Sequence, residues 1–419
     1  MAEWHIITGE YPPLQGGVSD YTRIVAEGLT AAGDEVVVWC PALAGDGRSR
    51  DVCETRACDD EGSGYMSSHG LTVRRELASF APSDWRRLGR MLDEERAPRR
   101  LLVQYVPHLY GYRAMNLPLC LWLWKRARFD GDEVQIVLHE PFLDFGGNPR
   151  QRAVAFVQRL MAAVILNGAC RVWTTTRAWE DCWRPYAFGR RVRFNWLPVP
   201  CTIPVACDPT SSSDTVSVRA RYVPRAGHSL VGHLGTYPQH IAAQLRLALP
   251  ALLAKNASVS VLLMGRGSTY TRDALIASHP SLAGRIHATG LLDERELSTH
   301  LAACDVLVQP FTDGVSTRRT SVMAGLAHGL PIVTTCGRLT ETLWAKSNAV
   351  KLVPADDAAA LSAGIEQLLN DAPERTRLRH AARTLYRERF DVSHIVAALR
   401  RERTAAEIVD NILPSEVKA

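Results

Sequence analysis

Short apolar runs typical of buried strands alternate with helical patterns along most of this chain of 419 residues. In the first half, strands are expected at residues 4–8, 35–40, 100–105, 134–138, 171–175 and 192–197, with helices between most of them. Parallel strands need long crossover connections, usually helices, so this alternation is typical of a parallel sheet with helices on both faces. The chain is therefore expected to have an α/β fold.

The alternation stops once and then resumes, which indicates two domains. Residues 198–227 are rich in proline, threonine and serine, and more strands are expected at 230–234, 259–265, 286–288, 306–310, 332–335 and 350–353. Because 419 residues exceed one ordinary hydrophobic core, we expect two doubly wound, Rossmann-like domains facing each other across a cleft. The expected limits are residues 1–200 for the N-terminal domain, 201–226 for a linker, 227–389 for the C-terminal domain and 390–419 for a final helical segment that packs back on the N-terminal domain.

Composition narrows the class of protein. A chain with 46% hydrophobic and 22% charged residues is typical of a globular protein. The net charge of +5 permits an anionic ligand or a membrane surface, and without a nucleic-acid-binding motif it does not indicate DNA or RNA as a partner. The sequence shows no apolar run of about 18 residues, no signal peptide pattern and no Cys-x-x-Cys pair. We therefore expect a cytoplasmic protein without disulfides or zinc, with peripheral contact at the inner face of the membrane left open.

The segment from Asp313 to Thr335 gives the clearest indication of a binding site. It follows an apolar strand and places two arginines and four hydroxyl side chains at the start of a helix expected over 319–328. These residues are Ser316, Thr317, Arg318, Arg319, Thr320 and Ser321. The free N–H groups and the positive dipole end of a helix attract anions, and guanidinium groups add full charges with forked donors. The pattern predicts a phosphate-binding turn; the alternative is an ordinary capped helix with two solvated arginines.

Five further positions are candidates for ligand contacts. Gly16 and Gly17 precede a helix expected over 19–32, where backbone amides could approach a phosphate, although an ordinary turn has the same pattern. Arg266 follows the strand expected at 259–265 and is either a phosphate ligand or a solvated loop residue. His108 and His139 each follow a strand, so each is either a contact at the ligand-binding edge of the sheet or a structural histidine.

Motifs in order along nearly the whole chain resemble the family 4 retaining glycosyltransferases of the GT-B fold. They are Glu10-Tyr-Pro-Pro, Gly16-Gly-Val, Gly33-Asp-Glu-Val, Gly232-His-Leu-Gly, Leu263-Met-Gly-Arg-Gly267, Gly290-Leu-Leu, Ala303-Cys-Asp-Val-Leu-Val-Gln-Pro310 and Ala327-His-Gly-Leu-Pro-Ile-Val-Thr334. Each motif is short, and the resemblance is specific because of their joint order and spacing.

The resemblance implies a hexosyltransferase-type enzyme that takes a sugar from a nucleotide diphosphate sugar of UDP, GDP or ADP type. The donor would be held mainly by the C-terminal domain, with backbone contacts to the base near Gly290. Transfer with retention, and without a metal or other cofactor, is implied as well. In this family the cleft histidine often follows the earlier strand, which favours His108 over His139.

The acceptor would lie on the N-terminal domain and is a carbohydrate, a lipid-linked or a small molecule. Glu10, Asp20 and Glu140 are the nearest carboxylates that could orient its hydroxyl groups. His139 with Glu140 also resembles a recurrent feature of the family.

The chain departs from the family at its charged positions. His233 stands where members usually have arginine, Pro238 or Gln239 where they have lysine, and Ser316 and Ala324 where they have two glutamates. One interpretation is a swap, in which Arg318, Arg319 and Arg266 supply the positive charge and the loss of the carboxylates leaves those arginines without a neutralising partner. The other interpretation is a site that has lost donor binding.

Alternatives in membrane contact and function remain open. The segment 117–128 combines tryptophans with a basic end, which suits either an anionic membrane surface or a core helix with a solvated terminus. A non-catalytic GT-B scaffold and a sugar-nucleotide epimerase are the rival functions. A nicotinamide dehydrogenase would need a G-x-G-x-x-G turn after the first strand, which is absent from the sequence.

Overall fold

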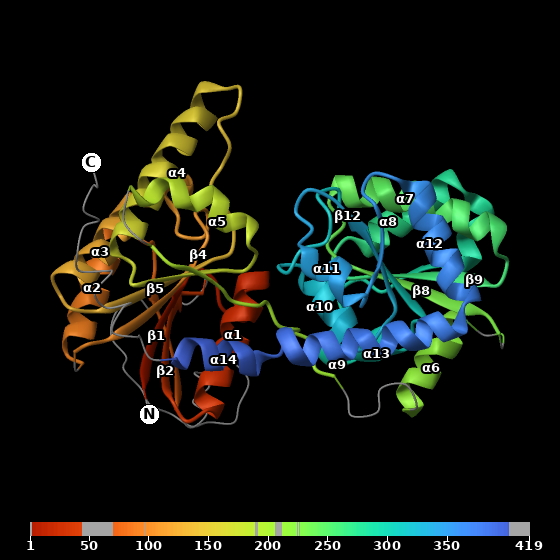
Figure 1. Cartoon of the computed structure of the whole chain (residues 1–419), viewed down its shortest axis with the longest axis horizontal. Helices are drawn as coiled ribbons and strands as arrows, with labels where there is room; N and C mark the ends of the chain where they lie inside the picture. Colours follow the sequence, from red (N-terminus) through yellow and green to blue (C-terminus); the bar gives the residue numbers. More distant parts are fainter. Residues whose placement is uncertain are drawn as a thin grey trace. The chain divides into compact units, whose positions relative to one another are not determined.

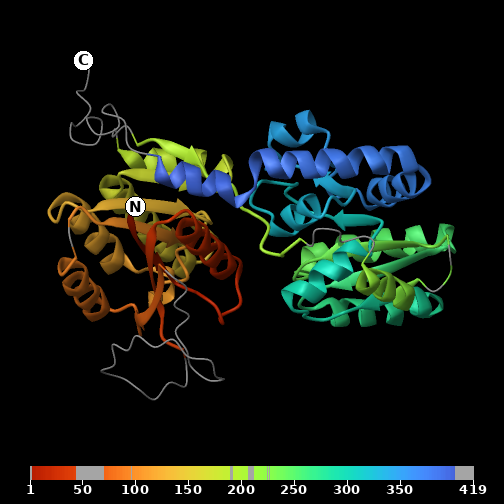
Figure 2. The ribbon, with the colours of Figure 1, turned by 90° about the horizontal axis from the view of Figure 1, so that it is seen from below.

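The chain divides into two compact units (Figure 1). The computed structural model describes residues 2–43, 70–95, 97–188, 192–205, 212–223, 225 and 227–401. Residues up to Pro198, together with the described residues from Val392 onward, form the first unit, and Val199–Asp391 form the second. Each unit contains its own parallel sheet with helices on both sides (Figures 1 and 2).

The first unit is built on a seven-stranded sheet within its described residues, in the order β3-β2-β1-β4-β5-β6-β7. All its strand pairs are parallel. The strands are β1 Glu3–Thr8, β2 Glu35–Pro41, β3 Leu71–Leu77, β4 Arg100–Tyr105, β5 Glu133–Leu138, β6 Arg171–Thr174 and β7 Phe194–Trp196. The helices are α1 Gly17–Ala31, α2 Pro82–Asp93, η1 Tyr112–Ala114, α3 Leu117–Arg128, α4 Pro149–Gly168, α5 Ala178–Trp183, η2 Arg184–Ala187 and α14 Val392–Arg400.

The second unit has a six-stranded parallel sheet among its described residues, in the order β10-β9-β8-β11-β12-β13. The strands are β8 Ser229–Leu234, β9 Val259–Met264, β10 Ile286–Ala288, β11 Val306–Gln309, β12 Ile332–Cys336 and β13 Lys351–Pro354. The helices are α6 Ser213–Tyr222, α7 Gln239–Lys255, α8 Ser268–Ser278, η3 Pro280–Arg285, α9 Glu294–Ala302, α10 Thr320–Ala327, α11 Thr342–Ser347, α12 Ala358–Asn370 and α13 Ala372–Arg389.

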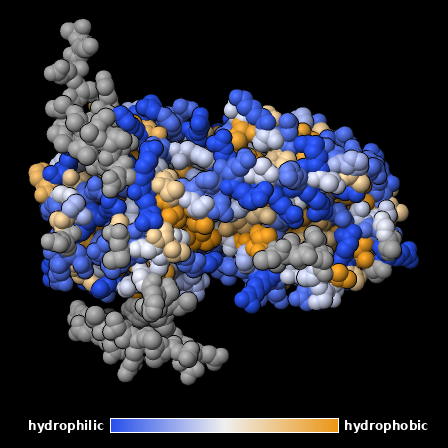
Figure 3. All heavy atoms as spheres, turned by 60° about the horizontal axis from the view of Figure 1, so that its bottom comes forward, coloured by the Kyte–Doolittle hydropathy of each residue, from blue (hydrophilic) through white to orange (hydrophobic). Residues whose placement is uncertain are grey.

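Burial on both faces explains why these strands were visible in the sequence. All six residues of β9 are buried, as expected for a central parallel strand covered by helices on either side. Trp4 and Trp85 in the first unit and Trp344 in the second are among the largest fully buried side chains. The face drawn in Figure 3 is largely hydrophilic, with smaller hydrophobic areas between.

Three elements escaped the sequence analysis. β3 lies at the edge of its sheet and carries polar residues on its less buried face, so its apolar pattern is weak. α11 is a helix of six residues. α6 lies inside residues 201–226, which were expected to be a linker, and this expectation was wrong because α6 packs on α9 as part of the second unit. Residues 42–70 are rich in Gly, Ser and Asp, which predicts a flexible excursion, and they fall mostly outside the described residues.

The last described helix, α14, packs on α1 in the first unit. Gly28 on α1 allows the close approach, because a Cβ atom at this position would lie 2.9 Å from Val396 Cγ2 and 3.0 Å from Val392 Cγ2. Arg400 Nε lies 3.1 Å from Asp34 Oδ2, which adds an ion pair at the end of the helix. The part of the expected helix beyond residue 401 lies outside the described residues.

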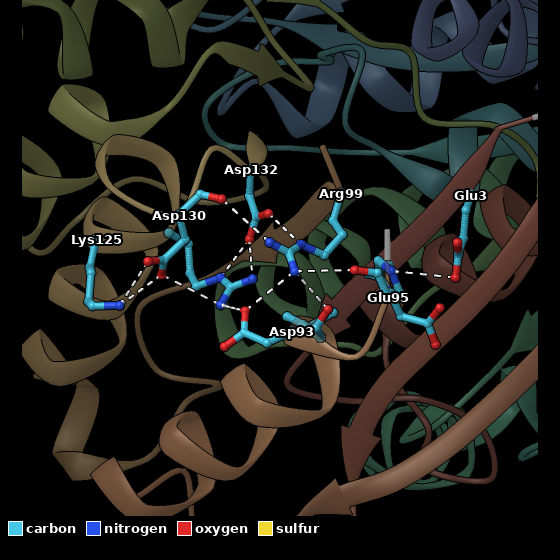
Figure 4. Close-up of polar contacts among 10 residues, drawn as sticks. Glu3, Asp93, Glu95, Arg99, Lys125, Asp130 and Asp132 are labelled. Carbon is cyan, nitrogen blue, oxygen red and sulfur yellow. Dashed lines mark hydrogen bonds and ion pairs between the residues drawn. The ribbon is translucent and has the colours of Figure 1, made fainter. Parts of the chain in front are cut away.

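A buried ionic cluster holds the amino-terminal edge of the first sheet (Figure 4). Arg99 Nε lies 2.7 Å from Asp132 Oδ1, and Arg126 binds the other oxygen of Asp132. Arg126 Nη1 also lies 2.7 Å from Asp93 Oδ1. The side chain of Asp132 is fully buried, so its charge depends on the two guanidinium groups for solvation.

The same cluster decides between the two interpretations of segment 117–128. This segment is α3, whose buried Arg126 points into the ionic cluster while Lys125 pairs with Asp130 at 2.8 Å. Trp122 lies against Trp85 with ring centroids 5.7 Å apart. α3 is therefore a core helix, and the interpretation of this helix as a membrane surface was wrong because its basic end pairs with the chain's own carboxylates.

We predict that Asp132→Ala destabilises the first unit by about 3–5 kcal/mol, because it leaves two buried guanidinium groups with only the more exposed carboxylate of Asp93 nearby. Urea unfolding followed by tryptophan fluorescence measures this loss. Glu27→Ala is the control, since it removes an exposed pair with Arg23 and should cost no more than about 1 kcal/mol. Equal effects of the two substitutions would contradict the structural role of the cluster.

Candidate functional site

The predicted phosphate turn lies at the carboxyl-terminal edge of the second sheet, between β11 and α10. β8 and β11 are neighbours, and the chain leaves them toward opposite ends of the sheet. In open parallel sheets, ligands bind beside the carboxyl ends of the strands at this point of reversal. The turn that carries Arg318 and Arg319 is therefore where a ligand of this fold is expected.

Asp313 holds both arginines of the turn. Arg318 Nη2 donates to Asp313 Oδ2 at 3.3 Å, and Arg319 Nη2 donates to Oδ1. The guanidinium of Arg319 also lies over the ring of Phe311, 4.3 Å from its centroid. The three charged side chains are between 19% and 24% exposed, so solvent and ligands can reach them.

Burial lowers the pKa of Arg319 to about 10, with the neighbouring charge of Arg318 acting in the same direction and Asp313 opposing both. At neutral pH the guanidinium is still protonated. Two adjacent cations share one carboxylate, so the group carries a net positive charge in a partly desolvated place. An anionic ligand would stabilise it.

The swap interpretation is corrected on one point. It supposed that the arginines lack a neutralising partner, whereas Asp313 pairs with each of them. The sequence already showed Asp313, but five and six residues separate it from the arginines, and the tight turn at Gly314, with φ of +85°, brings it back to them. The carboxylate binds one Nη2 on each arginine.

The hydroxyl residues of the turn have different surroundings. Thr317 donates to Glu341 through its N–H at 3.2 Å and through Oγ1 at 2.8 Å, and Ser321 Oγ donates to Gln309 Oε1 at 3.0 Å. Ser316 is buried, and its Oγ has no hydrogen-bond partner among the described residues. Thr320, half-buried, is the first residue of α10, which no described side chain caps. No described side chain therefore occupies the first amides of α10, where an anion could bind, although the Val322 N–H donates to the Arg319 carbonyl at 3.0 Å.

His233 replaces the family's arginine with an uncharged acceptor. Its Nδ1 donates to the Val308 carbonyl at 2.7 Å, and burial lowers its pKa to about 4. Nε2 is then a lone-pair acceptor, and it is buried without a partner within the described part of the chain. His233 can accept a hydrogen bond at neutral pH, but it cannot replace the charge of arginine.

Gly290 and Arg266 differ in what they offer. The Gly290 N–H donates to Ser268 Oγ at 2.9 Å, and its carbonyl accepts from the Gly265 N–H at 3.0 Å. These backbone groups join the ends of β9 and β10, and the expectation that the backbone near Gly290 contacts a base stays a prediction. Arg266 is exposed in the loop after β9.

A cavity of about 350 Å³ lies beside the same strand ends, between the first turns of α7 and α8. Tyr237, Arg246 and Tyr270 are among the residues that line it. The backbone of Tyr237 has φ of +56°, which is rare for a bulky side chain. The second unit thus has room for a ligand group next to its strand ends.

In the first unit, Glu10 fills the helix terminus that was expected to bind a phosphate. Glu10 Oε1 accepts from the Val18 N–H at 3.0 Å and the Ser19 N–H at 2.9 Å. A Cβ atom on Gly16 would lie 2.2 Å from Glu10 Oε1, so this glycine makes room for the carboxylate. Glu10 thus takes two of the amides at the start of α1 that a phosphate would use, and the roles expected of Gly16, Gly17 and Glu10 stay predictions.

His139 lies in a polar cluster at the carboxyl ends of β4 and β5. Its Nε2 is 2.7 Å from Gln104 Oε1, and its ring packs edge-on against Tyr21 with centroids 4.9 Å apart. Burial lowers the pKa of His139 to about 3. His139 is therefore neutral and a weak base at physiological pH, which suits it to hydrogen bonding better than to proton transfer.

His108 and Glu140 lie together at the same edge and are open to solvent. His108 Nδ1 is 3.7 Å from Glu140 Oε2, with side chains 61% and 50% exposed. The structure therefore brings together His108 and Glu140, two of the three predicted catalytic residues. The third, His139, is buried and contacts Gln104 instead. Asp20, half-buried, lies in the first turn of α1.

Sequence reasoning missed Gln104, Gln309 and Glu341. Both glutamines interrupt otherwise apolar buried strands next to a point of reversal, and that was an available signal. Glu341 follows β12, far from the turn in sequence, and no spacing rule marked it.

The described residues contain no group of three or more histidine, cysteine, aspartate or glutamate side chains arranged to hold a metal ion. Among the same residues, every helix is too short or too polar to cross a membrane.

Comparison with known proteins finds a family match within the second unit. Residues 229–371 match the family described as glycosyl transferases group 1. Over 181 residues, 42% of this chain and 45% of the relative, the chain is 31% identical to the phosphatidyl-myo-inositol mannosyltransferase of Mycolicibacterium smegmatis. The match thus spans about half the length of that relative.

The structure is similar to solved structures over nearly its whole length. Sucrose-phosphate synthase from Thermosynechococcus elongatus is 17% identical, with a TM-score of 0.69 over 95% of this chain and 97% of that one. Anabaena HepE, solved in complex with UDP and glucose, is 14% identical, with a TM-score of 0.61 over 94% and 97%. The predicted GT-B fold and the resemblance to this group of glycosyltransferases are confirmed.

We predict that His233→Gln weakens the pH dependence of stability in the second unit. The pKa of His233 is lowered on folding, so between pH 6.5 and about 4 the unfolded chain binds a proton that the folded chain excludes, and stability falls as pH falls. From pH 7.0 to 5.5 the wild type should lose about 1 kcal/mol more than the variant in urea unfolding. His240→Gln, at an exposed histidine, is the control; the same pH dependence in all three proteins would contradict the assignment.

Proposed function

We propose that this protein transfers a sugar from a nucleotide diphosphate sugar to an acceptor bound by the first unit. The observation that supports this most is the arginine pair of the phosphate turn. Arg318 and Arg319 lie at the uncapped start of α10, at the strand ends where this fold binds ligands, inside residues that match the group 1 glycosyltransferases.

The diphosphate of the donor would bind the two guanidinium groups and the first amides of α10. Asp313 binds one Nη2 of each arginine and fixes where the two side chains point. Guanidinium has five N–H donors, so further donors remain for phosphate oxygens. When the bond to the sugar breaks, negative charge grows on the departing diphosphate, and cations already in place stabilise that charge without reorganising.

The comparisons support a donor that carries a hexose, but they do not determine the base of its nucleotide. HepE was solved with UDP and glucose, and the relative from Mycolicibacterium smegmatis is named a mannosyltransferase. We therefore propose a nucleoside diphosphate hexose, with a UDP sugar as the first candidate. The name of the same relative contains a phosphatidylinositol, which supports a lipid-linked molecule among the possible acceptors.

We assign the acceptor side of the reaction to His108 and Glu140. Both are exposed at the carboxyl edge of the first sheet, where they can reach an acceptor hydroxyl group. His139 would stabilise the carboxyl ends of β4 and β5 through its hydrogen bond with Gln104. The family resemblance implies attack on the face that the leaving group vacates, with the phosphate accepting the proton and the configuration retained.

A second candidate is a GT-B scaffold that binds a partner without catalysis. Two observations favour it: Glu10 occupies the amides at the start of α1, and Asp313 already pairs with both arginines. A panel of nucleotide diphosphates and their sugars discriminates the two candidates by thermal shift. Binding of any member raises the midpoint by mass action, whereas a flat response across the panel would favour the scaffold.

We predict that Arg318→Ala with Arg319→Ala weakens donor binding at least about 100-fold, since two charge-assisted contacts to the diphosphate are lost. Isothermal titration with the donor found in the panel measures this change. Arg272→Ala, on the surface of α8, is the control and should bind as the wild type does.

Circular dichroism must show that the double variant is folded. A variant in which both arginines become lysine keeps the charge and loses the forked geometry, so its affinity should fall between the other two. Unchanged affinity in a folded double alanine variant would refute the assignment of the phosphate site.

We predict that transferase activity persists in excess EDTA, because guanidinium groups and helix amides take the role that a divalent cation has in other transferases. Donor turnover is measured by release of the nucleoside diphosphate after gel filtration into EDTA. If EDTA abolishes turnover and a divalent cation restores it, the arginines alone do not stabilise the departing diphosphate.

A further inference from the structure

Exposed apolar side chains gather at the amino-terminal end of α4 and in the loop before it. Leu143 and Phe145 in the loop are 47% and 57% exposed, and Phe156 and Leu160 on the helix are 64% and 44% exposed. We name these four side chains and the backbone that carries them, residues 143–160, the α4 tip. In Figure 1 the amino-terminal end of α4 projects beyond the other helices of the first unit.

Helical spacing places the apolar side chains of the tip on the face turned away from the core. Residues 149, 153, 156 and 160 follow each other at intervals of four, three and four, so they share one face of α4. Ala155, Gln158 and Met161 are buried on the opposite side. A surface helix normally presents polar residues outward, so Phe156 and Leu160 reverse the usual pattern.

The loop of the tip is fixed in place by hydrogen bonds to α4. The Leu143 N–H donates to Gln158 Oε1 at 2.8 Å, and its carbonyl accepts from Arg159 Nη1 at 2.8 Å. Arg152 Nε donates to the Gly146 carbonyl at 3.0 Å. Asn148 caps the helix by accepting from the Gln151 N–H at 2.7 Å.

Arg159 also orders the aromatic side chains. Its guanidinium lies 3.9 Å from the centroid of Phe145 and 4.6 Å from that of Phe142, and its Nε donates to Tyr186 Oη at 2.9 Å. Phe145 is thus held with more than half of its surface in solvent. The hydrogen bonds and ring contacts of this loop hold it in a conformation in which Leu143 and Phe145 remain exposed to solvent.

The charges around the tip are mostly positive. Residues 143–160 contain three arginines and one aspartate, and Arg150 and Arg152 are exposed. η1 adds the exposed Tyr112 and Arg113, and it is joined to α4 because Gln158 Nε2 donates to the Ala114 carbonyl at 3.1 Å. Aromatic and aliphatic side chains beside arginines are the composition that binds at the boundary between lipid headgroups and acyl chains.

We propose that the α4 tip docks on the surface of a membrane that contains anionic lipids. Phe145, Phe156 and Leu160 enter the interface, and Arg150 and Arg152 lie against lipid phosphates. A bilayer fits better than a protein partner because the surface is a narrow projecting end with basic residues beside it, and a bilayer can enclose a projection from all sides.

The position of the tip also bears on the acceptor. The tip and η1 follow β5 and β4, the same two strands that are followed by Glu140 and His108. A membrane that holds the tip would bring lipid headgroups toward this edge of the sheet. We therefore extend the proposed function, on which this step depends, to an acceptor that is lipid-linked and taken from the membrane surface.

Flotation with lipid vesicles tests the docking. The full chain should bind vesicles made of equal parts phosphatidylcholine and phosphatidylglycerol, and it should bind pure phosphatidylcholine much more weakly. The triple variant Phe145→Ser, Phe156→Ser and Leu160→Ser should lose at least about tenfold in binding to the anionic vesicles. Arg150→Gln should lose about fivefold.

Leu247→Ser with Val216→Ser is the matched control, because these side chains are 65% and 59% exposed on the second unit. It should bind vesicles as the wild type does. Absence of the wild type from the floated fraction, or equal binding by the triple variant, would overturn the proposal. A wild-type dimer in gel filtration that the triple variant converts to a monomer would also overturn it and would assign the tip to contact between copies of this chain.

Donor binding separates this inference from the proposed function. The triple variant should keep the thermal shift that a nucleoside diphosphate sugar gives the wild type, since the tip belongs to the first unit and the arginine pair to the second. If the protein binds vesicles but shows no response to any donor, the docking proposal stands, and the proposals of a transferase and of a lipid-linked acceptor fail. If the protein binds a donor but not vesicles, the docking proposal fails and the proposed transferase function stands.

Discussion

The shared carboxylate of Asp313 is the interaction on which the candidate donor site depends. Arg318 and Arg319 are neighbours in sequence, half-buried, and close to the positive end of α10, so their charges repel each other and the helix dipole. One oxygen of Asp313 for each guanidinium offsets this repulsion and fixes both side chains. The carboxylate does not cancel the charge, so the site remains attractive to a diphosphate.

The two units use the same helix-terminus chemistry in opposite ways. At α1 the chain's own Glu10 takes the amides, whereas α10 has arginines beside a start that no described side chain caps. The second unit is thereby the better anion site. The buried histidines at the strand ends follow a common rule as well: desolvation lowers the pKa of both His139 and His233, so each acts as a neutral hydrogen-bonding group. The solvent-exposed His108 beside Glu140 is better placed for contact with an acceptor.

The first unit separates its charges from its apolar surface. At the amino-terminal edge, Arg99 and Arg126 pair with the buried Asp132, and Arg126 also pairs with Asp93, so these charges stabilise the fold. At the carboxyl edge, the loop before α4 is anchored by Arg159 and Gln158 while it exposes Leu143 and Phe145. Arg126, which looked available to a membrane from its place in α3, is buried in the ionic cluster. The surface that fits a membrane was hidden from sequence reasoning, because exposure of Phe156 depends on which face of α4 the core covers.

The sequence by itself determined the two parallel sheets and the place of Arg318 and Arg319 at the start of a helix. Strand and helix periodicities are local properties, so residues 100–105 and 286–288 were assigned with their final bounds, and β3 was missed where an edge position weakened its pattern. Tertiary structure alone decided which groups meet. Glu341 reaches Thr317 across 24 residues, Ser268 takes the N–H of Gly290 across 22, and Gln104 meets His139 across 35. Strand order and register set such contacts, and they arise from packing of the whole unit, so no local pattern of residues encodes them.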